Sequence, residues 1–495
     1  MTLTPDRGSP AEKPSVPLDL NALRSALASA GSRPDGTPGS LQPLQMSEVS
    51  IGPGVLDRLG NVVAALSGGS GEVVVLAAAT PITVRGSALR EVVESQLASR
   101  YALRWVALGP ADGSVHADEA TVTAARKGAA DAGCVITVGS GTICDIGKAA
   151  ADSGVPLIVV QTATSVNGYA DPFSVLLKSG VKRTTPTRWP DVLIADTDVL
   201  LDAPDRLSLA GVGDMAAMFT ATADWYLAAL LRAEGTSTLA YRPEVTDLVR
   251  PHGEAMLALG GGLATDPGRL ADLTRLLTLS GIGMGVTGST APASGMEHAV
   301  SHLLEMAATA TGGTSARASL HGEQVGVASI VAAATWAYVR ERIAAGGLFR
   351  VAKLPDPDVI GDRISAAFAS LDPSGAMAAE CLADYAVKIR LLASAGDPLA
   401  TLEACWADCD AALGRLLTGP AELAAGLASA GLPVRFGDLP EPVDDELARW
   451  AVANCALQRR RFGVADLAML MGVWEDEDVA GVLAVAEEAA DGGTS

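Results

Sequence analysis

The fold is decided by the stretch CVITVGSGTICDIGK, residues 134–148. It opens with a short, continuous apolar run, which is typical of a strand buried on both faces. A turn of small residues and a helical pattern follow. Small residues let the backbone come close to a ligand, and the start of a helix offers free N–H groups to an anion. The stretch therefore predicts a strand–turn–helix unit that can hold a phosphate; the alternative is a tight turn that binds nothing.

A similar alternation continues on both sides of this unit. Further apolar runs of strand length lie at 73–78, 103–108, 157–160 and 191–196, and helical patterns lie at about 86–100, 117–132 and 142–153. Strands that alternate with helices favour a mostly parallel sheet with helices on both faces. Residues 46–205 are therefore predicted to form an α/β dinucleotide-binding domain of Rossmann-like type.

The chain changes character after about residue 204. Strand signals stop, and Ala- and Leu-rich segments with helical spacing take over. Residues 206–495 are therefore predicted to form an all-α domain that binds metal and substrate. Two charge runs near the end, at 459–461 and 475–478, are expected to be solvated surfaces. Residues 1–45 are rich in Pro, Gly and Ser and are predicted to be a flexible extension with one short helix at 19–30.

The bulk composition limits the function. The chain of 495 residues is 49% hydrophobic, which suits a globular protein of two domains. Its net charge of −21 repels phosphate backbones and anionic lipids, so neither nucleic acid nor a membrane is an expected partner. The sequence shows no signal peptide and no apolar run of membrane-spanning length. Six cysteines without a CxxC pair favour a reducing compartment, so the protein is expected in the cytoplasm.

Clustered histidines indicate the chemistry. Of only five histidines, three fall close together: His298, His302 and His321. With Asp214, the first and third supply two imidazoles and a carboxylate, which is a ligand set that leaves a position open at a catalytic Zn²⁺; Fe²⁺ or Ni²⁺ is the alternative. His302 lies one helical turn after His298 and is expected to contact substrate or relay a proton rather than bind the metal. The alternative is that each is an ordinary structural residue, as expected for the other two histidines.

Five stretches carry a resemblance to a known family. They are GSGTICDIGK at 139–148, QTATSVNGYADPFS at 161–174, the segment 179–214 that ends in AGVGD, SGMEHAVSH at 294–302, and LHGEQVGVASI at 320–330. In this fixed order they resemble the iron-containing alcohol dehydrogenases and dehydroquinate synthase, and within that group the sn-glycerol-1-phosphate dehydrogenase family. The resemblance covers about residues 48–335. It implies a dehydroquinate synthase-like fold with a cleft between an α/β domain and a helical domain.

The resemblance also implies roles for particular residues. It assigns the diphosphate of NAD or NADP to Gly139, Ser140, Gly141 and Thr142, the nicotinamide to Asp145, and the adenosine side to Thr162 and Ser165. It assigns the metal to Asp214, His298 and His321, and the substrate to Asn167, Lys182 and His302, the last two as partners of a phosphate. The implied reaction acts on a small phosphorylated polyol or ketone, sn-glycerol 1-phosphate or dihydroxyacetone phosphate, in phospholipid biosynthesis. A homo-oligomeric state is also expected.

The chain departs from the family pattern in its substrate loop. Where the family has PTAASHDG this chain has QTATSVNG, so Val166 replaces a histidine and Asn167 replaces an aspartate. An amide can hydrogen-bond a hydroxyl but cannot take its proton. The first predicted strand also ends without an acidic residue to grip a ribose hydroxyl, so NADP stays open beside NAD. Two other functions stay open: a dehydroquinate synthase-like cyclase, which is a lyase that uses NAD transiently, and a non-catalytic paralogue that binds nucleotide and metal.

Overall fold

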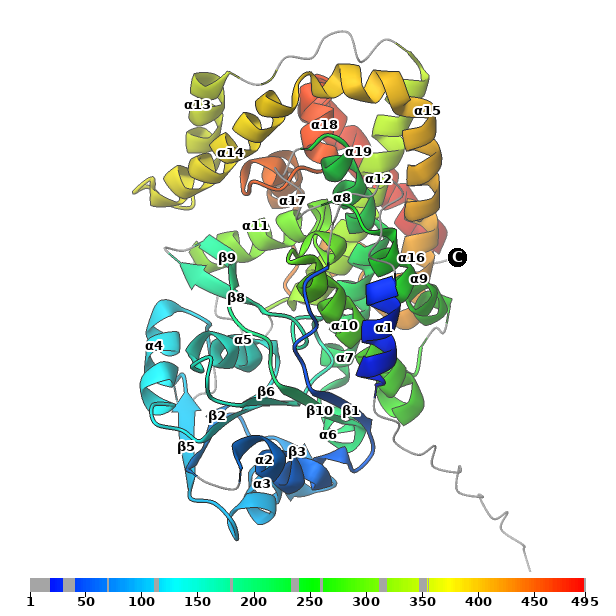
Figure 1. Cartoon of the computed structure of the whole chain (residues 1–495). Helices are drawn as coiled ribbons and strands as arrows, with labels where there is room; N and C mark the ends of the chain where they lie inside the picture. Colours follow the sequence, from blue (N-terminus) through cyan, green and yellow to red (C-terminus); the bar gives the residue numbers. More distant parts are fainter. Residues whose placement is uncertain are drawn as a thin grey trace, which may run out of the picture.

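A parallel sheet of six strands forms the first part of the chain, and helices form the second part (Figure 1). The structure, a computed structural model, describes residues 18–29, 41–68, 71–110, 115–178, 181–232, 240–258, 261–310, 318–346, 354 and 356–493. The strands are β1 (Glu48–Gly52), β2 (Val73–Ala78), β5 (Leu103–Leu108), β6 (Cys134–Gly139), β7 (Leu157–Gln161) and β10 (Val192–Asp196). They stand in the order β1, β10, β7, β6, β2, β5, and every pair is parallel. The predicted fold class is confirmed.

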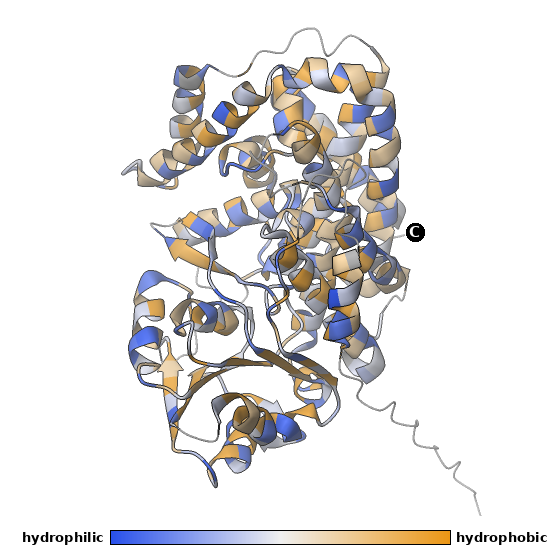
Figure 2. Cartoon of the chain, in the orientation of Figure 1, coloured by the Kyte–Doolittle hydropathy of each residue, from blue (hydrophilic) through white to orange (hydrophobic). Residues whose placement is uncertain are grey.

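The central strands are apolar along their length because both faces of the sheet are covered. In β2, Val73 and Val75 face one core, whereas Val74 and Leu76 face the other, which is the period of two expected of a strand. The first face is covered by α2 (Leu59–Ser67) and α3 (Leu89–Leu97), and the second by α4 (Glu119–Gly128) and α5 (Gly141–Ala150). Figure 2 shows apolar residues concentrated in these strands. Five strands match the predicted runs; the edge strand β1 is not predicted.

Two small antiparallel hairpins complete the α/β part. They are β3 (Thr83–Val84) with β4 (Ser87–Ala88), and β8 (Phe173–Lys178) with β9 (Val181–Pro186). The sequence pattern does not predict the second hairpin, because β9 reads VKRTTP and carries little apolar alternation. This hairpin extends from the α/β part toward the helices, and β9 contacts α11 (Met296–Ala310) (Figure 1). It therefore connects the two parts of the molecule.

The helical part is built around α12 (His321–Ala344). Its residues 322–336 are all buried, so this stretch has no polar face. The other helices are α6 (Thr197–Leu201), α7 (Asp205–Ala216), α8 (Ala221–Leu230), α9 (Pro243–Ala258), α10 (Pro267–Thr287), α13 (Pro357–Phe368), α14 (Ala376–Ala395), α15 (Pro398–Leu416), α16 (Pro420–Ala430), α17 (Asp445–Asn454), α18 (Val464–Leu470) and α19 (Asp476–Gly493). Helices α7, α11, α16 and α19 pack against α12. Within the described ranges, no helix combines the length and apolarity needed to cross a bilayer.

The start of the chain is packed where the structure describes it. The helix predicted at 19–30 is present as α1 (Leu20–Ser29). Leu20, Leu23 and Leu27 form its buried face, and Leu44 is buried as well. The apolar stripe of α1 therefore packs against the core, and Leu44 packs there too. The rest of 1–45 lies outside the described residues.

Candidate active site

Two helices meet through glycines and bring Asp214 of α7 next to His321, the first residue of α12. A Cβ atom on Gly213 would lie 2.1 Å from the carbonyl oxygen of Gly322. One on Gly322 would lie 1.8 Å from the carbonyl oxygen of Ala210. No side chain fits at these distances, so the glycines of AGVGD and HGEQ let the two backbones touch. This contact places a carboxylate and an imidazole side by side.

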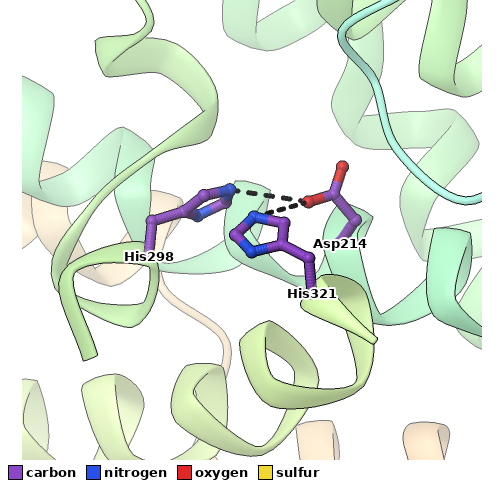
Figure 3. Close-up of side chains that lie close together, drawn as sticks. All are labelled: Asp214, His298 and His321. Carbon is purple, nitrogen blue, oxygen red and sulfur yellow. Dashed lines mark ion pairs between the residues drawn. The ribbon is translucent and has the colours of Figure 1, made fainter. Parts of the chain in front are cut away.

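His298, near the start of α11, completes this cluster (Figure 3). Its Nε2 atom lies 3.5 Å from Asp214 Oδ1, and Nε2 of His321 lies 3.8 Å from the same oxygen. Around a tetrahedral Zn²⁺ with bonds of about 2.1 Å, ligand atoms stand about 3.4 Å apart, so the three atoms have the spacing of a metal site. The side chains of Asp214 and His298 are buried, whereas that of His321 is 21% exposed. The cluster is therefore accessible from one side.

Each imidazole is held by a second polar group. The carboxylate of Glu297 lies 3.1 Å from His298 Nδ1, and the hydroxyl of Ser301 lies 3.1 Å from His321 Nδ1. These contacts orient both rings so that Nε2 faces the shared carboxylate, as in metal sites whose ligands are hydrogen-bonded from behind. Burial alone would lower the pKa of His298, but hydrogen bonds to Asp214 and Glu297 raise it above its usual value. A metal ion would therefore compete with a proton here.

Asn167 supports the cluster through its backbone. Its N–H group donates to Asp214 Oδ2 at 3.0 Å, which turns the other carboxylate oxygen toward the histidines. Its side-chain Nδ2 donates to the hydroxyl of Ser280 at 3.1 Å. A Cβ atom on Gly281 would lie 2.5 Å from the carbonyl oxygen of Asn167, so α10 holds this loop closely. The backbone role is independent of the replacement of an aspartate by Asn167.

A second set of possible metal ligands shares His321. His302 and Glu305 of α11 lie close enough to His321 for the three to hold an ion. However, Glu305 already forms an ion pair with Lys182 of β9 at 2.7 Å. Burial would raise the pKa of Glu305, but Lys182 and His321 hold it well below its usual value. Because a lysine already neutralises Glu305, the set around Asp214 is the better metal site.

The surroundings of His302 argue against one of its expected roles, that of a positive charge beside a phosphate. Its ring centre lies 6.2 Å from that of His298 and 5.5 Å from that of His321. Burial, followed by the charge of His321, holds the pKa of His302 well below its usual value. The ring is therefore neutral near pH 7. It can offer or accept a hydrogen bond, but it adds no positive charge to that of Lys182 beside a phosphate.

A cavity of about 410 Å³ extends from the cluster of Asp214, His298 and His321 to Gly141 and Thr142 of the glycine turn. The predicted site residues on its wall are Gly141, Thr142, Asp145, Asn167, Lys182, Asp214, His298, His302 and His321. Gly139, Ser140, Thr162 and Ser165 lie beside it but do not form the wall. Thr162 and Ser165 are buried, and the N–H group of Thr162 donates to the carbonyl oxygen of Gly139. The roles of these four residues in cofactor binding stay predictions.

A second charged cluster lies where the α/β part forms the cavity wall. The ammonium of Lys148 is fully buried and lies 3.2 Å from the carboxylate of Asp145 and 3.0 Å from that of Asp171. The backbone N–H of Val175 also donates to Asp145, at 3.1 Å. Burial raises the pKa of Asp171 to about 6, against the opposing effect of Lys148. Asp145, the residue expected to contact the nicotinamide, thus already forms an ion pair with Lys148.

Sequence reasoning misses several residues at the site. Glu297, Ser301 and Glu305 follow each other at intervals of four on α11, which places them on one helix face. That spacing, in EHAVSHLLE, is the signal that could have revealed them. His116 is expected to be an ordinary structural residue, yet it is exposed and lies on the cavity wall. Lys148 has its signal in the last position of GSGTICDIGK, whereas Asp171 has no comparable signal.

Part of the arginine run near the chain end also reaches the site. Arg459 donates to the hydroxyl of Ser294 at 3.1 Å, and Arg461 donates to that of Thr290 at 2.6 Å. Ser294 and Thr290 lie on the cavity wall just before α11. The expectation that the run is a solvated surface is therefore wrong for Arg459 and Arg461. Both brace the segment that leads into the helix of His298.

The fold is shared with solved dehydrogenase structures. A probable glycerol dehydrogenase from Sinorhizobium meliloti 1021 matches with a TM-score of 0.56 at 15% identity, covering 90% of this chain and 97% of that one. Glycerol dehydrogenase from Schizosaccharomyces pombe matches with a TM-score of 0.53 at 16% identity, covering 91% and 92%. Residues 50–204 match the family model of iron-containing alcohol dehydrogenases. This match and the shared fold place the chain among the iron-containing alcohol dehydrogenases.

Relatives from archaea and bacteria narrow this class. A glycerol-1-phosphate dehydrogenase (NAD(P)+) from Halorubrum lacusprofundi is 31% identical over 319 residues, which cover 60% of this chain and 81% of that protein. The protein of the same name from Pyrococcus horikoshii is 30% identical over 304 residues, with the same coverage. The one from Bacillus licheniformis is 37% identical over 222 residues, 44% of this chain and about half (53%) of that relative. The chain belongs to the glycerol-1-phosphate dehydrogenase family, whose named members are oxidoreductases acting on CH–OH groups.

Proposed function

We propose that this protein is a metal-dependent, NAD(P)-linked oxidoreductase that interconverts sn-glycerol 1-phosphate and dihydroxyacetone phosphate. One observation carries the proposal: a single cavity has a cluster of three metal-binding side chains on one part of its wall and a glycine turn at a helix start on another. The relatives' names support the substrate and the cofactor.

The residues on the wall fit both absent groups. Asp214, His298 and His321 would hold Zn²⁺, or alternatively Fe²⁺ or Ni²⁺. The turn at 139–142 would receive the cofactor diphosphate on the free N–H groups of α5. A bound divalent ion would supply Lewis acidity toward a substrate oxygen, and the nicotinamide would supply or accept a hydride. Strand β2 ends in alanines followed by Thr80, with no carboxylate for a ribose hydroxyl, so NADP is accommodated beside NAD.

The remaining side chains orient the substrate and handle its proton. Asn167 uses its Nδ2 on Ser280, which leaves its amide oxygen to accept a hydrogen bond from a substrate hydroxyl. His302 lies on the cavity wall, where its ring can hydrogen-bond a substrate hydroxyl or a water. Lys182 supplies positive charge for a phosphate. Asn167 cannot take up the proton of that hydroxyl.

The test follows NADH and NADPH absorbance with dihydroxyacetone phosphate, dihydroxyacetone and several sugar phosphates. The protein is first stripped with a chelator and then reloaded separately with Zn²⁺, Fe²⁺ and Ni²⁺. We expect stoichiometric oxidation of the cofactor with dihydroxyacetone phosphate, loss of that activity on metal removal, and its return with at least one ion. Activity that survives complete metal removal would contradict the proposed metal dependence.

The same assay separates the two alternative functions. Release of phosphate with only catalytic amounts of NAD would favour a dehydroquinate synthase-like lyase. Binding of NAD(H) and Zn²⁺ without turnover of any polyol phosphate would favour a non-catalytic paralogue, the alternative that Asn167 keeps open. All six cysteines are unpaired and five of them are buried, which supports a reducing compartment such as the cytoplasm. Phospholipid biosynthesis and a homo-oligomeric state stay part of the proposal.

A further inference from the structure

Glu305 lies between two functional groups that come from different parts of the molecule. One carboxylate oxygen lies 2.7 Å from the ammonium of Lys182, on the hairpin of the α/β part. The other lies 3.5 Å from Nδ1 of His321, a residue of the metal cluster in the helical part. The side chain of Glu305 is only 17% exposed and that of Lys182 31%, so water screens their attraction only in part. Glu305 therefore neutralises the charge of Lys182 and also contacts His321, a proposed metal ligand.

Lys182 is the one lysine or arginine among the described residues on the cavity wall. The carboxylates on that wall are those of Asp118, Asp145, Asp171 and Asp214. The buried ammonium of Lys148 is already engaged by two of them. An anionic group on a substrate therefore has to find its compensating side-chain charge at Lys182, which Glu305 occupies.

The backbone at Lys182 is anchored from the other face of its strand. Neighbouring side chains of a strand point to opposite faces, so Arg183 points away from Lys182. Arg183 lies 3.1 Å from Asp384 and 3.6 Å from Glu380, both on α14, and donates to the carbonyl oxygen of Gln458 at 3.3 Å. Because β9 is held in this way, Lys182 can change its partner only by rotating its side chain. Glu305 and an incoming anion must then compete for one ammonium at one place.

We propose that Glu305 is a specificity-determining residue that competes with the phosphate of the substrate for Lys182. This inference rests on the proposed function and adds to it a residue that sets the preference for phosphorylated over unphosphorylated substrates. A phosphate that enters the cavity takes Lys182 away from Glu305. Glu305 then keeps its contact with Nδ1 of His321, so it remains beside the metal ligand while the substrate is bound.

The test is a double-mutant cycle in the full chain, loaded with the metal that supports activity. The variants are Glu305→Gln, Lys182→Met and the double variant. The control is Glu254→Gln, which removes an exposed carboxylate paired with Arg250 on α9, outside the cavity. Two quantities are measured: the ratio of KM for dihydroxyacetone phosphate to KM for dihydroxyacetone, and calorimetric Kd values for sn-glycerol 1-phosphate and inorganic phosphate. Bound metal is measured for every variant, because Glu305 touches His321.

We expect Glu305→Gln to lower the KM ratio and the Kd of sn-glycerol 1-phosphate by about tenfold, because the amide no longer neutralises Lys182. Lys182→Met should raise both by about tenfold or more. In the Lys182→Met background, Glu305→Gln should change the KM ratio and the Kd of sn-glycerol 1-phosphate by less than about twofold, because the ammonium group for which Glu305 and phosphate compete has been removed. Glu254→Gln should leave both within about twofold of the wild type.

Three results would overturn the inference: an unchanged KM ratio in Glu305→Gln, a weaker binding of sn-glycerol 1-phosphate by that variant, or an equal effect of Glu305→Gln with and without Lys182. Failure of the proposed function gives a different result, since the wild type would then show no turnover of dihydroxyacetone phosphate. In that case the Kd of inorganic phosphate still decides whether Glu305 and an anion compete for Lys182. A changed KM ratio that only follows lost metal would also count against the inference, because it would mark a structural role at His321.

Discussion

The two charged clusters on the cavity wall neutralise a buried carboxylate in different ways. In the α/β part, the ammonium of Lys148 lies between Asp145 and Asp171, so the chain supplies its own cation. In the helical part, the ion-pair partners of Asp214 are His298 and His321. A buried carboxylate needs a compensating charge, and imidazoles provide it only when they are protonated or share a metal.

The two clusters therefore differ in whether their charge is balanced by the chain itself or by a bound proton or metal ion. The lysine cluster is complete when the chain has folded, so its removal should affect folding first. In the histidine cluster, Nε2 of His298 and of His321 face Oδ1 of Asp214 at the spacing of ligands to a metal ion. Loss of one of these side chains should therefore affect metal binding and activity first. The following variants test this division, from the largest expected effect to the smallest.

Removal of a metal ligand should have the largest effect. His298→Ala and His321→Ala should each lose bound metal and lower kcat/KM by at least about a thousandfold, because the charge that stabilises the reacting oxygen goes with the ion. Elemental analysis of the purified variants and the cofactor absorbance assay check this. His252→Ala, at an exposed position of α9, is the matched control and should keep both metal and activity. An unchanged metal content in the first two variants would refute the ligand assignment.

Removal of the internal cation should act on stability. Lys148→Met leaves Asp145 and Asp171 buried without their shared partner, so the free energy of unfolding should fall by roughly 3–5 kcal/mol. Urea unfolding followed by circular dichroism measures this, and metal content should change little in the folded fraction. Lys127→Met, an exposed lysine at the end of α4, is the control for loss of one positive charge. A stability equal to that of the wild type would mean that one of the two carboxyl groups is already protonated.

A change behind a metal ligand should have a smaller effect than loss of the ligand. Glu297→Gln weakens the hold on Nδ1 of His298 and should reduce metal affinity by about 10–100-fold while the fold stays intact. Competition with a chromogenic chelator gives the dissociation constant. Glu254→Gln again serves as the control for loss of one glutamate. Glu297 also accepts hydrogen bonds from the hydroxyl of Thr220 and the N–H group of Gly295. An affinity equal to that of the wild type would show that Glu297 supports only these two groups and not the metal site.

The smallest expected effect is a pH dependence from the lysine cluster. The pKa of Asp171 is about 6 in the folded protein, above the ordinary 3.8, because burial disfavours the charged form. The folded state therefore binds the proton more tightly, and this contribution to stability is present below about pH 4 and lost as pH rises through 6. Relative to Asp171→Asn, the wild type should lose roughly 1–3 kcal/mol of unfolding free energy between pH 4.5 and 7.5. The exposed variant Asp272→Asn is the control, and a difference that stays constant with pH would contradict the assignment.

The α/β part was largely predictable because its signals are local. A strand such as β2 is recognised from consecutive apolar residues, and its two faces follow from the alternation of side chains. The same local character made the glycine turn at 139–142 visible. Strand β1 and the hairpin β8–β9 escaped because an edge strand and a polar hairpin need no continuous apolar run. Without the hairpin, the position of Lys182 on the cavity wall could not be predicted.

The helical part was predictable in kind but not in arrangement. Helical spacing shows that a helix forms, but it does not say which neighbour covers which face. The histidines stand out by their rarity, and Asp214 adds the carboxylate that completes a metal-type ligand set with two of them. Nothing in the sequence indicates that Arg459 and Arg461 brace the start of α11, or that Lys148 meets Asp171. These contacts join residues that are far apart in the chain or on different elements.

The sequence by itself therefore determined five of the six strands of the main sheet, the helices α3, α4 and α5, and the strand–turn–helix unit at 134–148, because these depend on neighbours within a few positions. The tertiary structure decided the rest. It shows which carboxylate the histidines share and that Lys182 is paired with Glu305. The physical reason is that charge, burial and hydrogen bonding depend on distances in space. Glycines such as Gly213 and Gly322 set those distances by letting backbones touch.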